Sequence, residues 1–249
     1  EQSELSRQGQ TESLRPVVNR SRRDQECPSP SLAPITEHPA WERSTAGLLL
    51  TFQKQGPAAY LSQLELQTVL ERLFRRAKLP LSFSRGFHPM PKISFGRALP
   101  VGVHSLAESC VLGLRHPPRI EDLCAHLQRF SIKGLTFTRA EPVPLTSKLQ
   151  QPDRELFQVQ WHIPQEAAQG ESGVWQELLQ APSWTVTRRT KKGLRDVDLR
   201  SKVQEVQVLE DSTLHITFDW TQGYISPLFI IRSLHPHLEL TNFTLCKMG

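Results

Sequence analysis

The chain alternates between apolar stretches with the period of strands and stretches with the period of helices. The run GLLLTFQK at residues 47–54 has the length and apolar character of a buried strand. Residues 62–79 place apolar side chains at i, i+3, i+4 and i+7, which is the pattern of an amphipathic helix. Ser62 and Glu65 have the spacing of a capping box at the start of that helix. The first ordered elements are therefore predicted to be a strand and a helix.

The same kinds of pattern continue to the C-terminus. Ser226 and Pro227 mark the start of the last helix, because proline is favoured at the first helical position. We expect strands at 47–54, 80–84, 107–114, 133–144, 156–163, 184–189, 212–220 and 238–246, and helices at 62–79, 119–130, 172–181 and 226–235. This order is β-α-β-β-α-β twice, which predicts an α+β fold of two tandem ferredoxin-like halves.

Three regions follow from this pattern. Residues 1–44 are rich in Ser, Pro, Gln and Arg and have no hydrophobic period, so we expect a disordered linker or tail. Residues 45–150 form the first predicted half and residues 151–249 the second. The chain does not begin with Met, and we expect it to be a fragment of a longer polypeptide or a processed chain.

In both halves the predicted connection between the second and third strands is long. It is RGFHPMPKISFGRALPVGVHS at 85–105 and RTKKGLRDVDLRSKVQEVQVLED at 189–211. Ordinary hairpin loops have about 2–5 residues, and longer loops in compact domains are commonly functional. Both connections are basic, so we expect two binding loops carried on a rigid scaffold.

The charge balance points to a polyanionic partner. The whole chain has a net charge of +5, from 30 Lys and Arg against 25 Asp and Glu. Residues 1–44 contribute 6 − 7 = −1, so the remainder carries 24 − 18 = +6. Cations interleaved with Phe87 and Phe95 suit a nucleic-acid backbone and its unpaired bases, although these two rings could equally belong to the core. The predicted nucleic-acid-binding residues are Arg85, His88, Lys92, Arg97, Arg188, Arg189, Lys191, Lys192, Arg195 and Arg200.

Other residues of these two loops are expected to shape the backbone or to take part in chemistry. The residues expected to shape the first loop are Gly86, Pro89, Pro91, Phe95, Gly96 and Pro100. In the second, one of Asp196 and Asp198 could point inward if the segment is extended. Such an Asp among arginines could hold an arginine in place or act as a base or nucleophile. The candidate catalytic residues are accordingly Asp198 and His88.

Other chemistry is not indicated. The four cysteines are widely spaced and match no zinc pattern, so we expect buried thiols in a reducing cytoplasm, no metal site and no cofactor in this chain. The histidines have no metal-ligand spacing, and no phosphate-binding glycine loop occurs. No apolar run approaches the roughly 20 residues that a membrane helix needs, so we expect no membrane partner.

Two segments carry a family resemblance: SQLELQTVLERLFRRAKLPLSFSRGFHPMPKISFGRALPVGV at 62–103 and KKGLRDVDLR at 191–200. They resemble the uncharacterised radical SAM-linked proteins, a bacterial family encoded beside or fused to cobalamin-binding radical SAM proteins. The resemblance implies a radical SAM partner, in trans or fused upstream, and a link to tRNA or rRNA biology. This chain has neither the CxxxCxxC cluster motif nor the DxHxxG cobalamin motif, so we do not expect it to be the radical enzyme.

Three functions remain open from the sequence. The first is an accessory domain that binds structured RNA through the basic loops, which would form one surface, and presents it to the radical SAM partner. The second is an RNA-modifying enzyme that resembles the pseudouridine synthases in outline and uses Asp198. The third is a protein-docking domain for the radical SAM partner that binds no RNA.

Overall fold

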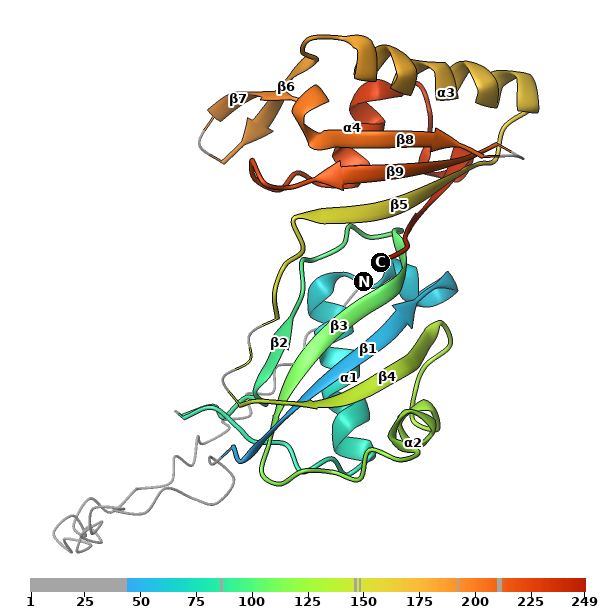
Figure 1. The fold of residues 1–249 in the computed structure, drawn as a ribbon. Coiled ribbons are helices and arrows are strands. Elements are labelled where there is room, and N and C mark those ends of the chain that lie inside the picture. Colours follow the sequence, from blue (N-terminus) through green and yellow to red (C-terminus); the bar gives the residue numbers. More distant parts are fainter. Residues whose placement is uncertain (1–43, 86, 146, 148, 192, 210–211) are drawn as a thin grey trace, which may run out of the picture. The chain divides into compact units, whose positions relative to one another are not determined.

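The computed structural model describes residues 44–249 except 86, 146, 148, 192, 210 and 211. They form a mixed α+β fold dominated by one mostly antiparallel sheet, which confirms the predicted class (Figure 1). The predicted tail lies outside the described residues apart from Ser44, as do Gly86 and Lys192. No helix in the described ranges is long and apolar enough to cross a membrane.

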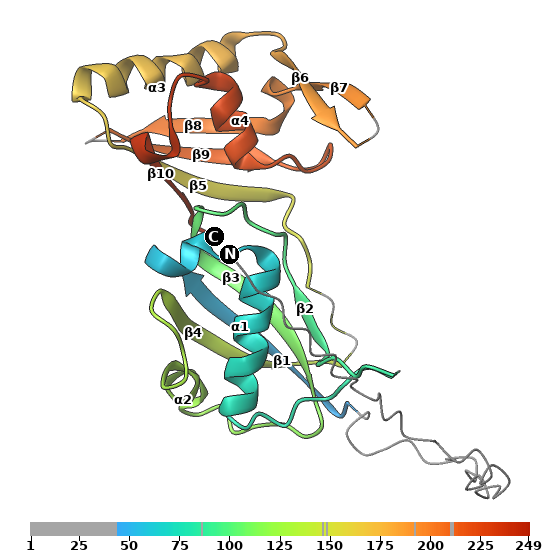
Figure 2. The ribbon, with the colours of Figure 1, turned by 180° about the vertical axis from the view of Figure 1, so that it is seen from behind.

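Residues 44–150, here called the N-terminal part, contain a sheet covered on one face by helices. The elements are β1 (Ala46–Lys54), α1 (Gln63–Arg76), β2 (Ile93–Phe95), β3 (His104–Leu114), α2 (Leu123–Gln128) and β4 (Leu135–Val143). Figures 1 and 2 show α1 lying along one face of β1 and β3. Leu66, Leu70 and Phe74 of this helix are buried in one hydrophobic cluster with Leu50 and Leu112 of the sheet. The apolar stripe read from the sequence is therefore the face of α1 that forms this core.

Residues 151–249, here called the C-terminal part, contain a second core under two helices. The elements are β5 (Arg154–Trp161), α3 (Gln165–Gln180), β6 (Thr185–Thr190), β7 (Gly193–Asp198), β8 (Val203–Val208), β9 (Thr213–Asp219), α4 (Pro227–Leu234) and β10 (Phe243–Lys247). Trp175 of α3 and Ile230 of α4 are buried with Phe157 of β5 and Phe218 of β9. Burial alternates along β5 and β9, as expected for strands with one face in a core.

The strand order joins the two parts into one sheet. Among the described residues it runs β4-β1-β3-β10-β5-β9-β8, and β2 pairs with β3 beside this path. The connecting strand is β10, which pairs in parallel with β3 through Cys246 opposite His104 and Lys247 opposite Ser105. It also pairs antiparallel with β5 along its length. The last strand of the chain therefore closes the gap between the N-terminal and C-terminal parts.

Local signals at two helix starts are confirmed. The Glu65 backbone N–H donates to Ser62 Oγ over 3.4 Å, and the Ser62 N–H donates to the Glu65 carboxylate over 2.9 Å. This is the capping box that the sequence predicts for α1. Ser226 is the N-cap of α4, and Pro227 is its first residue. Both signals act within four residues, so no tertiary contact was needed to predict them.

Two predicted elements are wrong. Residues 80–84 form only isolated bridges, Leu81 with Leu114 and Phe83 with Pro91, and β2 is the strand that pairs along β3. Residues 189–211 are not one long loop: they contain β7 and β8, and β6 pairs with β7 in a separate two-stranded sheet. Most of β7 is exposed, so it has no hydrophobic period by which a sequence pattern could identify it.

Gly134, immediately before β4, has a backbone that only glycine accommodates easily. Its φ is +93°, and its carbonyl accepts the Gln55 N–H over 2.8 Å. A Cβ at this position would overlap the Gln55 carbonyl oxygen and lie 3.0 Å from the Ala58 nitrogen. The close approach connects the start of β4 to the end of β1.

We expect Gly134→Ala to lower the free energy of unfolding by about 2 kcal/mol or more, through backbone strain and steric overlap. Gly173 in α3 is the matched control, because nothing lies within 4 Å of the Cβ it would gain. Gly173→Ala should raise stability by about 0.5–1 kcal/mol, since alanine is the better helix former. Denaturant unfolding followed by tryptophan fluorescence measures both; equal midpoints for the two variants would contradict the role given to Gly134.

Candidate functional site

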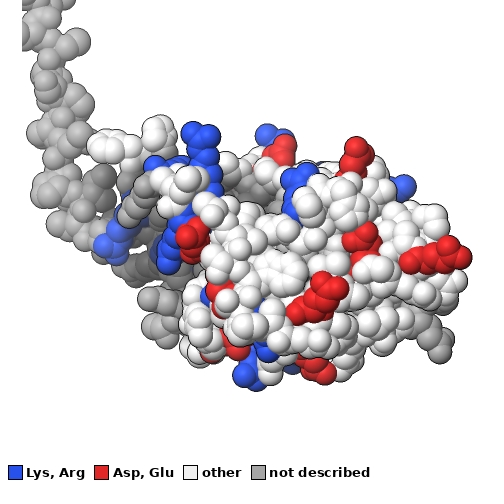
Figure 3. Space-filling view, turned by 90° about the horizontal axis from the view of Figure 1, so that it is seen from above, with Lys and Arg blue, Asp and Glu red and all other residues white. Residues whose placement is uncertain are grey.

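A cleft of about 300 Å³ lies between the β6–β7 hairpin and the loop that follows β9. Three cations, Arg188, Arg195 and Lys202, contribute to its lining together with Asp196, Asp198 and Tyr224. Figure 3 shows Lys and Arg gathered at the end of the C-terminal part that carries the hairpin, whereas Asp and Glu predominate over the rest of that face. The cleft therefore brings three cations and two carboxylates around a hollow with one aromatic wall.

Lys202 is the least exposed of these cations, with 5% of its surface accessible. Its Nζ donates a hydrogen bond to the Gln222 carbonyl over 2.8 Å. Burial lowers the pKa of Lys202, and the charges of Asp219 and Asp198 oppose that shift. An ammonium group that has lost part of its hydration gains more from an added anion than a fully solvated one does.

The two aspartates of the cleft differ in position. Asp198 is half-buried, and its Oδ1 accepts the backbone N–H groups of Trp184 over 2.8 Å and Arg200 over 3.1 Å. Asp196 is exposed and accepts a hydrogen bond from Thr187 Oγ1 across the hairpin over 2.7 Å. Asp198 is thus the more inward of the pair, and its contacts fix the base of the hairpin.

The arginines are held to different degrees. Arg200 donates from Nε to the Leu179 carbonyl over 3.1 Å and from Nη1 to the Val203 carbonyl over 3.0 Å. These bonds tie the turn before β8 to the end of α3. The Arg188 guanidinium lies over the Phe229 ring of α4, 5.4 Å from its centroid. A guanidinium stacked on an aromatic ring still has its edge available for bidentate contacts.

Arg97 connects the predicted first loop to this cleft. Its guanidinium lies 5.2 Å from the centroid of the Tyr224 ring, which lines the cleft. Its Nη1 donates to the Pro152 carbonyl over 2.8 Å and lies 3.5 Å from the Glu155 carboxylate. Burial and the negative charge of Glu155 raise the pKa of Tyr224 to about 12, against the effect of Arg97. The Tyr224 phenol is therefore neutral in the physiological pH range.

A group of buried charges lies behind Arg97. Glu155 Oε2 accepts the indole N–H of Trp220 over 2.7 Å, and its Oε1 lies 3.1 Å from Lys247 Nζ. Lys247 also lies 3.4 Å from Glu108 Oε1. Burial is the main cause that raises the pKa of Glu108, and Lys247 opposes the shift. The sequence pattern does not indicate Glu108, Glu155 or Lys247, because their partners come from strands distant in the sequence.

The other predicted residues of the first loop lie elsewhere. In Figures 1 and 2 the connection between α1 and β2 is at the end of the N-terminal part farther from the β6–β7 hairpin. Lys92 donates to Ser44 Oγ over 3.2 Å and lines a separate cavity of about 260 Å³. The loop is closed by the Ser84 N–H, which donates to the Met90 carbonyl over 2.8 Å. The structure therefore associates Arg97 with the cleft, but not the described residues 84–85 and 87–92.

Exposure separates the remaining predicted residues. The Phe87 ring is fully exposed, with a relative accessibility of 102%, whereas Phe95 is half-buried and packs against the N-terminal core. Pro91 is buried. The exposed residues are Arg85, His88, Pro89, Arg189 and Lys191, and the partly buried ones are Gly96 and Pro100. The sequence left open whether these two rings contact nucleic acid or belong to the core. Phe95 belongs to the core, whereas Phe87 is outside it.

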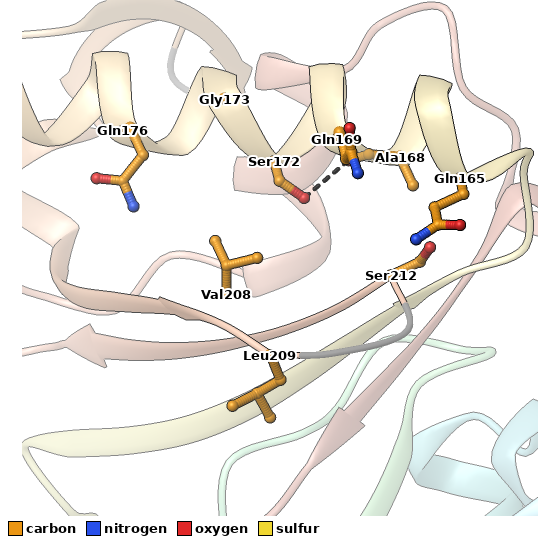
Figure 4. Close-up of a pocket in the computed structure, with 9 residues that line it drawn as sticks. All are labelled: Gln165, Ala168, Gln169, Ser172, Gly173, Gln176, Val208, Leu209 and Ser212. Atoms are coloured by element: carbon orange, nitrogen blue, oxygen red, sulfur yellow. Dashed lines mark hydrogen bonds between the residues drawn. The ribbon is translucent and has the colours of Figure 1, made fainter.

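A further cavity of about 370 Å³ lies between α3 and the ends of β8 and β9. Figure 4 shows Gln165, Gln169 and Gln176 along its α3 side, with Val208 and Leu209 opposite. The nine residues that line it include no charged or imidazole side chain. These nine described residues offer neither an acid–base group nor a cation for an anion, so the basic cleft is the better candidate site.

The described residues indicate no metal centre and no disulfide. Within the ranges that the structure describes, no three His, Cys, Asp or Glu side chains come together as metal ligands. Cys110, Cys124 and Cys246 are free thiols, and burial raises the pKa of each. Raised pKa values keep these thiols protonated and poorly nucleophilic.

Comparison with known proteins gives one family match. The model of a family described as an uncharacterized protein conserved in bacteria (DUF2344) matches residues 48–227. No curated protein matches the chain. A crystal structure of a Cbf5–Nop10–Gar1 complex is similar over 85% of this chain, at 10% identity and a TM-score of 0.36, and the match spans 51% of that structure's chain. A TM-score this low identifies neither a shared fold nor a shared activity.

We expect a spectrophotometric titration near 295 nm to show one tyrosine ionising near pH 12, and Tyr224→Phe to abolish that step. The folded protein keeps the Tyr224 proton to a higher pH than the unfolded chain does. This residue's contribution to stability therefore falls as the pH rises from about 10 towards 12. Ionisation of Tyr224 near pH 10 would contradict the packing described around Arg97 and Glu155.

Glu155→Gln keeps an acceptor for Trp220 but removes the charge that faces Lys247 and Arg97. We expect the free energy of unfolding to fall by about 3 kcal/mol, since two partly buried cations lose their counter-charge. The control is Arg139→Gln, which breaks the exposed pair of Arg139 and Glu141 and should change stability by less than about 1 kcal/mol. Equal effects in chemical denaturation would show that the buried charges are not coupled.

Proposed function

This chain belongs to the DUF2344 family of proteins conserved in bacteria, and we propose that it is an accessory domain that binds structured RNA and presents it to a radical SAM protein. The observation that carries the RNA-binding step is the cleft in which Arg188, Arg195 and Lys202 come together beside Tyr224. Phosphate groups carry the negative charge of RNA, and clustered cations are their usual protein contacts.

The side chains of the cleft suit a phosphate next to an unpaired base. Arg188 offers a planar fork of donors, and Lys202 offers a partly desolvated point charge. Tyr224 is partly exposed and neutral, so its ring can stack on a base while Arg97 lies against its other side. Asp196 and Asp198 repel phosphate oxygens locally and so restrict the positions that the anion can occupy.

The proposal of a radical SAM partner is based on the sequence resemblance. Residues 62–103 and 191–200 resemble the radical SAM-linked proteins, and β7 and the turn before β8 belong to the second of these segments. We propose that the partner, in trans or fused upstream, supplies the radical chemistry and its cofactors, and that this chain holds none. Free, protonated thiols suit a reducing cytoplasm.

We also propose that residues 45–150 and 151–249 are two ferredoxin-like halves. The supporting observation is strand order: β4-β1-β3 with β2 beside β3, and β10-β5-β9-β8. In each set the order is fourth, first, third and second along the chain. The β6–β7 hairpin is then an insertion in the second half, placed so that its base borders the cleft.

The two alternatives make different demands on these residues. An RNA-modifying enzyme that uses Asp198 needs that carboxylate to reach a substrate, but its Oδ1 already accepts two backbone N–H groups. This favours a structural carboxylate. A docking domain without RNA would instead use the cations of the cleft against an acidic surface of the radical SAM partner.

We expect the double variant Arg188→Ala/Arg195→Ala to bind bulk bacterial tRNA or rRNA about tenfold more weakly, through lost phosphate contacts. It should also flatten the dependence of log K on log salt by about 1.4, or roughly 0.7 for each lost contact to single-stranded RNA. Filter binding over a salt series measures both. The control is Lys133→Ala/Arg232→Ala, which removes the same charge from exposed positions outside the cleft.

Two results would overturn the proposal. One is equal affinity and equal salt slope for the cleft and control variants. The other is recovery from a bacterial lysate of a protein partner without RNA, in a complex that resists nuclease. The second result would support the docking alternative.

A further inference from the structure

A different pocket, of about 270 Å³, lies where the N-terminal and C-terminal parts meet around β10. Val103, Leu228 and Phe243 contribute apolar walls. His104, His162 and Thr244 contribute polar atoms from β3, the end of β5 and β10. Among the residues that the structure describes, those that line it include no Lys, Arg, Asp or Glu. The pocket is therefore suited to an uncharged ligand with polar edges.

The polar side chains of the pocket still have hydrogen-bonding capacity for a ligand. His162 Nε2 and Thr244 Oγ1 lie 2.6 Å apart, so one donates to the other. The second nitrogen of His162 and the remaining capacity of the hydroxyl are left for a ligand or water. Burial and the positive charge of Lys54 lower the pKa of His104, which favours its neutral ring. A neutral imidazole both donates and accepts a hydrogen bond.

An aromatic ring stands at the mouth of this pocket. Tyr60 is 67% exposed, which is unusual for a large aromatic side chain, and it is placed at the end of the short 3₁₀ helix Gly56–Tyr60. Its ring lies beside Gly102, where a Cβ would meet Tyr60 Cε1 at 3.9 Å. Gly102 has a φ of +86° and donates its N–H to the Ala59 carbonyl over 2.9 Å. Backbone contacts thus position the segments that carry Tyr60 and Gly102 at the mouth.

We infer that this pocket binds the base of an unpaired ribonucleotide. A nucleobase is planar, uncharged and ringed by donors and acceptors, and it is commonly held by an aromatic ring and a few hydrogen bonds. Tyr60 would stack on the base, and His104, His162 and Thr244 would bond to its edge. This inference rests on the proposed RNA-binding function and adds to it the recognition of a single base away from the basic cleft.

Other ligand classes fit the lining less well. A free phosphate or sugar phosphate needs a cation, and the described part of the lining has no Lys or Arg. An acyl chain would cover the partly buried His104 and Thr244 without offering their polar atoms a partner, which is unfavourable. The exposed Val101 and Leu240 at the rim can contact the ribose face without adding charge.

The test uses adenosine, guanosine, cytidine and uridine, each added to the intact chain at millimolar concentration, with histidine ring signals followed by NMR. We expect at least one nucleoside to shift the His104 and His162 signals in a saturable way, and ribose 5-phosphate to shift neither. His162→Phe should weaken nucleoside binding about tenfold, which corresponds to one lost hydrogen bond of about 1.4 kcal/mol. His116→Phe is the matched control at an exposed position outside the pocket and should change nothing.

Binding of no nucleoside, or equal binding by the His162→Phe and His116→Phe proteins, would overturn the inference, provided that thermal unfolding shows both variants folded. The Arg188→Ala/Arg195→Ala protein separates this result from failure of the proposed function. It should bind nucleosides normally while it loses affinity for RNA. If the protein bound nucleosides but had no affinity for RNA, the pocket would be a nucleoside site and its proposed role in RNA recognition would be rejected.

Discussion

The pairing of β10 with both β3 and β5 is the constraint on which the rest of the structure depends. The strand brings Lys247 between Glu108 of the N-terminal part and Glu155 of the C-terminal part. Buried carboxylates are unfavourable without a counter-charge, so the closing strand and the acids it neutralises need one another. Because β10 lies between β3 and β5 in the strand order, it is the strand that makes the described sheet continuous.

This buried charge group also determines how the basic cleft is built. Glu155 faces Arg97 and accepts the Trp220 N–H, and Arg97 lies against Tyr224. Tyr224, the aromatic wall of the cleft, is thus positioned by Arg97, which Glu155 holds. Asp198 fixes the base of the β6–β7 hairpin by accepting two backbone N–H groups. The contacts of Arg97 with Tyr224 and of Asp198 with the hairpin therefore fix two sides of the cleft.

The base pocket inferred from the structure lies on the same junction but uses the opposite chemistry. Its strand residues come from β3 and β10, which the closing pairing brings together, and His162 directly follows β5. The described residues that line it have no charged side chain. An RNA that engages both places would pair its phosphates with Arg188, Arg195 and Lys202 and insert a base beside Tyr60. The division follows a general rule for nucleic-acid recognition, in which phosphate contacts position the chain and base contacts select it.

The sequence by itself determined the α+β class, the capping box at Ser62, the start of α4 and the apolar face of α1, because each is a pattern within a few residues. It also identified most cations of the cleft by composition. Only the tertiary structure decided that Arg97 lies against the Tyr224 wall of this cleft while residues 84–85 and 87–92 lie elsewhere. It also decided that Asp198 is the inward aspartate and that Glu108, Glu155 and Lys247 meet. It also showed β7, whose mostly exposed residues carry no hydrophobic period. Such contacts join residues that are far apart in the chain, and local periodicity does not predict which strands become neighbours.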